Sequence, residues 1–186
     1  MKRILVIIVL NLFFITPSQS NDIKDFQIEG MSIGDSLNKF FNEKNISEAA
    51  DESYDDKVYL TKTFHKKGFK KYEAIQISYK GNDKKRIITS INGVVSYPNN
   101  IDECKKQMYN IDSELINMFP AAIRKDWGKY DHNNKTGHYF PITYDFKDGS
   151  TVMVSCHDWN QETGIDDNLK VSLFDSKYSE YIKRKN

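Results

Sequence analysis

Three residue types that can do covalent chemistry stand side by side near the end of the chain. Cys156, His157 and Asp158 are the types found in a thiol-hydrolase triad, where a base activates the cysteine thiol. The base must lie within hydrogen-bonding reach, and known triads assemble in space rather than from adjacent residues. In an extended strand, successive side chains point to opposite faces. Adjacency therefore argues against a triad, because Cys156 and His157 would point away from each other.

The two cysteines of the chain fit a disulfide better. Cys156 shares the alternation of Val152 and Val154, which predicts that it faces the core. Cys104 lies on an apolar stripe with Met108 at helical spacing. Both side chains thus point to one helix–sheet interface, and an oxidising compartment favours a bridge between them. We expect a Cys104–Cys156 disulfide, with two buried thiols or a catalytic cysteine as the alternatives.

Histidines with a nearby acid suggest a second kind of chemistry. His132, His138 and His157 could surround a metal ion together with Asp158. Their spacing matches no strong zinc motif, and two of the three lie in a polar stretch where histidine is usually solvated. We therefore expect no metal ligand and no cofactor.

Aromatic side chains border the same polar stretch. Exposed aromatics on a rigid scaffold are common at protein interfaces. We expect an interaction surface that includes Trp127, Tyr130, His132, His138 and His157. The alternative is that Trp127 folds back onto the end of the preceding helix.

The first twenty residues predict export. Lys2 and Arg3 precede an apolar run, Ile4 to Ile15, that is too short to span a bilayer comfortably. Pro17 and Ser20 then supply a helix breaker and a small residue before cleavage. We expect residues 1–20 to be a signal peptide, with an uncleaved anchor as the alternative, and the protein to be periplasmic or secreted.

The composition of the rest indicates one folded domain, residues 21–186. The formal net charge of the chain is +1, so there is no electrostatic case for nucleic acid. No second apolar run approaches membrane length. Abundant aromatic and β-branched residues favour a fold rich in sheet.

The elements that must position these side chains follow from periodicity. The expected order is helix, three strands, helix, three strands, helix. The helices are expected at 33–44, at 101–118 and, as a short one, after Asp175. The strands are expected at 57–64, 72–80 and 86–97, in a hairpin within 140–159, and at 169–174. Residues 124–138 are expected to be a long polar loop. The pattern predicts an α+β fold with helices on one face of an antiparallel sheet, in two α-β-β-β halves at about 26–97 and 101–174. Secreted inhibitors of the β-lactamase-inhibitor type and outer-membrane assembly lipoproteins have a similar layout.

Two glycines bear on strand register. A three-residue turn with Gly149 left-handed pairs Tyr144 with Val152, which keeps the apolar sides together. Asn92-Gly93 permits either a hairpin turn or one long strand bent at Gly93, and we favour the long strand.

Two stretches resemble a known group of proteins. The segments "FQIEGMSIGDSLNKFF" at 26–41 and "NIDECKKQM" at 100–108 resemble small exported proteins of marine alphaproteobacteria, over about a sixth of the chain. Asn38 departs from the apolar residue expected there. The resemblance implies export and carries no activity.

These observations lead to two functional hypotheses. The first is a non-catalytic exported domain that binds a protein or envelope component. The second is a small periplasmic hydrolase or metal-dependent enzyme that uses His138, His157 and Asp158. Convergence of these side chains with a carboxylate in one pocket would favour the enzyme. An exposed aromatic patch would favour binding.

Overall fold

The structure, a computed structural model, describes residues 22–65, 68–132 and 135–185, and the expected signal peptide lies outside these ranges. Within them, nine strands form one antiparallel sheet. The strands are β1 Ala50–Asp51, β2 Tyr59–Phe64, β3 Ala74–Lys80, β4 Ile88–Ser96, β5 Ile123–Asp126, β6 Tyr130–Asp131, β7 Gly137–Asp145, β8 Thr151–Trp159 and β9 Asn168–Phe174. The helices are α1 Glu43–Glu48, α2 Ile101–Met118 and α3 Ser176–Lys185, with 3₁₀ turns at Ile23–Asp25, Leu37–Lys39 and Gln161–Thr163.

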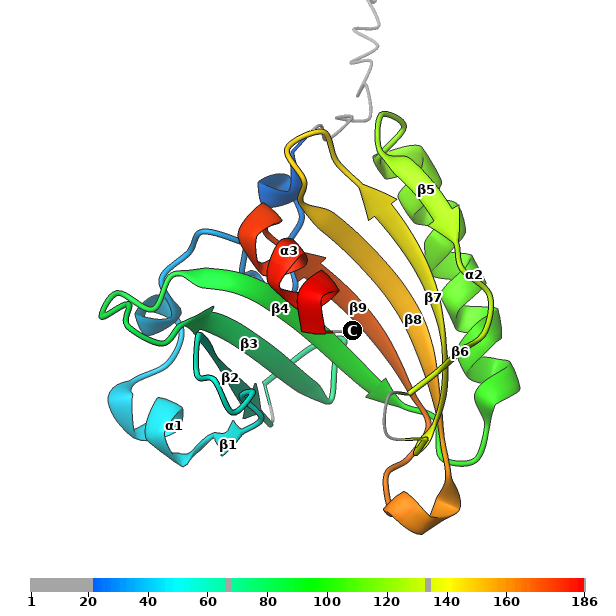
Figure 1. Ribbon diagram of the computed structural model, residues 1–186, viewed down its shortest axis with the longest axis horizontal. Coiled ribbons are helices and arrows are strands. Elements are labelled where there is room, and N and C mark those ends of the chain that lie inside the picture. The colour runs from blue at the N-terminus through cyan, green and yellow to red at the C-terminus, as the bar shows by residue number, and fades with distance from the viewer. Residues whose placement is uncertain (1–21, 66–67, 133–134, 186) are drawn as a thin grey trace, which may run out of the picture.

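The sheet is built from two similar halves (Figure 1). Its strand order is β1-β2-β3-β4-β9-β8-β7-β5, with β6 also paired to β7. Each half contributes a three-stranded meander, β2-β3-β4 and β7-β8-β9. The last strands of the two meanders, β4 and β9, are antiparallel neighbours at the centre. The expected α+β class is therefore confirmed.

The two faces of the sheet differ in character. The disulfide face carries buried apolar side chains, including Ile77, Ile91, Val154, Cys156 and Val171. The histidine face is the opposite one, and includes Gln76, Asn92, Ser155, His157 and Lys170. The apolar alternation of the strands thus produces one core face and one face with polar side chains.

The long helix α2 covers the disulfide face, as expected. The Asn100 side chain caps it by accepting a hydrogen bond from the Glu103 amide. The shorter α3 lies on the opposite, histidine face, in front of the sheet in Figure 1, so the expectation that the helices share one face holds for α2 but not for α3. It follows β9 directly, is capped by Asp175, and meets the sheet where the Ser78 hydroxyl donates to the Tyr178 hydroxyl at 3.0 Å.

The disulfide between Cys104 of α2 and Cys156 of β8 is confirmed. The two sulfur atoms are 2.03 Å apart and the Cα atoms 6.0 Å apart. Both residues are fully buried. Because this bond links the helix to a central part of the sheet, Cys156 is a structural residue.

The helix expected over residues 33–44 does not form as a continuous helix. The Gly34 and Leu37 amides donate to the carbonyls of Ile88 and Arg86, so this segment pairs with the start of β4 instead. Gly34 also has φ of +91°, which an α-helix does not allow. The apolar spacing still buries Ile33, because burial requires a face but no particular backbone.

The hairpin register was predicted correctly. Tyr144 pairs with Val152 across β7 and β8, and Gly149 has φ of +86°. Asn92-Gly93 lies within the single strand β4, as favoured. Gly93 is required there because the Tyr72 ring lies on it, and an added Cβ would come within 2.4 Å of that ring.

Candidate functional site

The strand β8 separates the residues that first suggested catalysis. Cys156 pairs with Phe140 and faces α2, whereas His157 pairs with Tyr139 on the histidine face. Asp158 pairs with His138, on the opposite side of the strand from His157 and one pair further along than Cys156 and Phe140 on its own side. Alternation along the strand therefore disperses the three side chains, as the sequence argument expected.

Six aromatic rings form one array on the histidine face, which we call the aromatic cluster. Its members are Trp127, Tyr130, His132, Tyr139, His157 and Trp159. The His132 ring is stacked on Trp159, with centroids 4.1 Å apart and planes 7° apart. It also stacks on His157 at 5.3 Å. Four of the five residues expected at an interaction surface thus come together.

The aromatic cluster is positioned by two short strands in the segment 124–138, which was expected to be a loop. Residues 124–138 contain β5 and β6, which pair along the edge of β7. Tyr130 pairs with Tyr139, and the His132 amide donates to the Gly137 carbonyl. The expectation of a long loop was wrong because these short edge strands are polar and exposed, so no alternation marks them.

The outer part of the cluster is exposed and held in place. Trp127 and Tyr130 are 45% and 43% exposed. The Trp127 indole N–H donates to the Thr143 hydroxyl at 3.0 Å, so the ring rests on β7 rather than on the end of α2. Its ring centroid lies 6.3 Å from that of Tyr130 in an edge-on arrangement.

His138 does not join the cluster. It lies on the other side of β7, where its Nδ1 is 2.7 Å from Asp131 Oδ1 at an exposed position. His157 contacts the Ser155 hydroxyl instead, through Nε2 at 3.1 Å. The set His138, His157 and Asp158 therefore does not converge on one pocket.

The Ser155–His157 pair has the residue types of a nucleophile and its base, and it was not foreseen. Ser155 is fully buried, however, which shields its hydroxyl from a substrate. His157 Nδ1 has no hydrogen-bond partner among the described residues, so no carboxylate orients the imidazole. The pair is explained by hydrogen bonding within the sheet.

Lys170 is the residue of this face that sequence reasoning missed. It lies on β9 between Val94 of β4 and Ser155 of β8, and it is only partly exposed. The sequence did contain a pattern that predicts this position, because the alternation of Leu169 and Val171 places Lys170 on the polar side of its strand.

The ionisable groups of this face are biased toward their neutral forms. Burial lowers the pKa of His157 well below its ordinary value, and the nearby Lys170 and His132 lower it further. Burial, with Lys170, also lowers the pKa of His132. The pKa of Lys170 is lowered by burial, against a weaker opposing effect of Glu52. Burial is the largest cause of the lowered pKa in all three groups, and neighbouring positive charge adds to it at the two histidines.

This arrangement predicts that the protein loses stability in mild acid. The unfolded chain protonates histidine near the ordinary pKa of 6.5, whereas the folded chain holds His157 neutral to lower pH. The unfolded state then binds more protons, so the free energy of unfolding should fall as the pH drops below about 6.5. The expected slope is up to about 1.4 kcal/mol per pH unit for each such histidine.

Urea unfolding between pH 7 and pH 5 measures this slope. The variant His157→Phe keeps a ring in the stack and cannot bind a proton, so its stability should fall less steeply. An equally steep fall in the variant would contradict the assignment to His157.

Two hollows lie away from the aromatic cluster. One, of about 440 Å³, is lined by α1 and β2 residues, including Phe64. The other, of about 830 Å³, lies between α2 and the segments at Phe26 and Tyr72, over Leu169 and Val171. Neither includes a residue of the aromatic cluster.

The described part of the chain contains neither a metal-ligand cluster nor a membrane-spanning helix. No group of three or more histidine, cysteine, aspartate or glutamate side chains there is arranged to hold a metal ion. Among the helices of that same part, none has the length and apolarity needed to cross a membrane. In comparisons with known proteins, no family model, curated protein or solved structure matches the chain.

Proposed function

We propose that the chain is an exported, non-catalytic binding domain that docks a protein of the cell envelope against the aromatic cluster. One observation carries this proposal: Trp127 and Tyr130 remain nearly half exposed beside a stack of partly buried rings. Fixed aromatic side chains provide large contact area and lose little conformational entropy on binding.

Further features support the two parts of the proposal. The Cys104–Cys156 bond suits an oxidising compartment, as does the apolar run at residues 4–15. The burial of Ser155 and the separation of His138 from His157 count against hydrolysis on this face.

Affinity capture with matched variants tests the proposal. The bait is the chain from Asn21 onward, incubated with envelope extract of its own cells, and bound proteins are identified by mass spectrometry. The double variant Trp127→Ala/Tyr130→Ala should lose at least about 90% of a partner that the wild type retains, since central aromatic residues often contribute 2 kcal/mol or more.

The control is Tyr109→Ala, which removes a 50% exposed tyrosine from α2, away from the histidine face. It should retain the partner. The proposal would be wrong if the double variant captured the same proteins in the same amounts, or if both variants lost them equally.

A further inference from the structure

The position of Lys170 is unusual for a cation. It lies near the centre of the sheet. Among the described residues its Nζ has one hydrogen bond, a long one of 3.5 Å to Gln76 Oε1. In residues 22–65, 68–132 and 135–185, no carboxylate forms an ion pair with it. Glu52 partly opposes the lowering of the Lys170 pKa, and its carboxylate accepts hydrogen bonds from Thr63 and Gln76.

Polar atoms without partners lie on the same face of the sheet as this lysine. His157 pairs with Asn168, two residues before Lys170 on β9, and is only 9% exposed. Its Nδ1 has no partner among the described residues. The same holds for Trp159 Nε1 and Ser172 Oγ. Buried polar groups in proteins are almost always hydrogen-bonded, so a group of them without partners indicates a site that a ligand completes.

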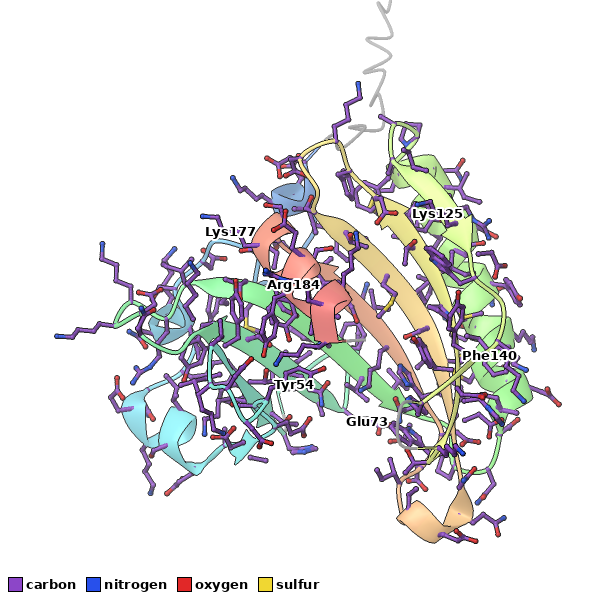
Figure 2. The ribbon with its side chains drawn as sticks, viewed as in Figure 1. Tyr54, Glu73, Lys125, Phe140, Lys177 and Arg184 are labelled. Carbon is purple, nitrogen blue, oxygen red and sulfur yellow. A yellow bond between two sulfur atoms is a disulfide. The ribbon has the colours of Figure 1, made fainter. Side chains whose placement is uncertain are left out.

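The helix α3, which lies on the histidine face, also contributes positive charge. The last turn of α3 carries Lys183, Arg184 and Lys185. Figure 2 shows Arg184 on this helix in front of the sheet. Lys185 pairs with Asp56, while Lys170 lacks an acidic partner within the described chain. A ligand that complements this face would carry negative charge.

We propose that the occupant of the histidine face is an acidic protein segment, one carboxylate of which binds Lys170. The inference rests on the proposed function, since it names the chemistry of the partner that docks against the aromatic cluster. The carboxylate supplies the counter-charge that a partly buried lysine needs, and the flanking rings contact the rest of the segment.

The fluorescence of the protein reports on this face specifically. The chain contains two tryptophans, and both Trp127 and Trp159 belong to the aromatic cluster. Hexaglutamate, titrated at low ionic strength, should change the emission in a saturable way. Hexaglutamine, which has the same length and no charge, should not.

Variants assign the binding to Lys170. Lys170→Met keeps the apolar stem and removes the charge, and it should weaken hexaglutamate at least about tenfold, as expected for loss of a charge-assisted hydrogen bond. Lys106→Met removes an exposed lysine of α2 that pairs with Glu103 and should leave the affinity unchanged. Should Lys170→Met not fold, the ¹³Cε resonance of Lys170 in the wild type is the second measurement, and it should shift on addition of hexaglutamate.

Three results would overturn the inference. These are equal affinity in Lys170→Met, equal binding of hexaglutamine, or binding of hexagalacturonate in place of hexaglutamate, which would point to an acidic glycan. The proposed function fails separately, when Trp127→Ala/Tyr130→Ala retains the captured partner. If that double variant loses the partner and Lys170→Met retains it, docking stands and the role of Lys170 does not.

Discussion

Replacing both Cys104 and Cys156 with alanine should lower the free energy of unfolding by up to about 4 kcal/mol. The disulfide joins residues 52 positions apart, and the loss of loop entropy in the unfolded chain grows with that separation. Both sulfur atoms also fill the interface between α2 and β8, so their removal leaves space in a packed core. Urea unfolding of oxidised wild type and variant at pH 7 measures the difference.

Reduction provides the control for this prediction. A reductant should destabilise the wild type toward the level of the double variant and leave the variant itself unaffected. Equal midpoints for oxidised wild type and double variant would show that the bond contributes nothing to stability.

A second large effect is expected from the polar cluster between α2 and β5. Arg124 forms two hydrogen bonds of 2.8 Å with the Asp112 carboxylate, and the Tyr144 hydroxyl donates to the same residue. Burial raises the pKa of Asp112, but the hydrogen bonds from Arg124 and Tyr144 outweigh it and hold the pKa below its ordinary value. The cluster fixes the polar edge strand β5 to the helix.

Arg124→Met should lower the free energy of unfolding by about 2 kcal/mol, because it leaves an 8% exposed carboxylate without its cation. The estimate lies below the 3–5 kcal/mol typical of fully buried pairs because Arg124 itself is about one-third exposed. Unfolding curves for Arg124→Met, Asp112→Asn and the double variant give the coupling energy.

The neighbouring pair Lys125–Asp145 offers a matched control. It has an N–O distance of 3.3 Å and a lysine that is 49% exposed, so Lys125→Met should cost less than about 1 kcal/mol. Additive effects of Arg124→Met and Asp112→Asn would show that the two side chains do not stabilise each other.

Much of the fold follows from local sequence pattern. The spacing of Cys104 and Met108 fixed the buried side of α2, and the parity of Cys156 with Val154 fixed the buried side of β8. The two patterns together predicted the disulfide. These predictions succeed because a helical stripe or an alternating strand must bury its apolar side wherever it lies.

Other elements depend on partners that no local pattern reveals. The segment around Gly34 has helical spacing, yet its backbone pairs with Ile88 at the start of β4. The strands β5 and β6 consist of exposed residues, so no apolar alternation predicts their pairing with β7. Backbone hydrogen bonds and polar or aromatic side-chain contacts such as Lys125–Asp145 hold them in place.

The candidate site shows the same division. The sequence by itself determined that Cys156 and His157 point to opposite faces, because alternation is a property of every strand. Only the tertiary structure decided that His132 stacks on Trp159, and that Lys170 lies among polar atoms with no acid in ion-pair range within the described chain. The reason is physical. The backbone of a single strand sets the face to which each side chain points, whereas strand register and edge pairing across the whole sheet set which side chains of different strands meet.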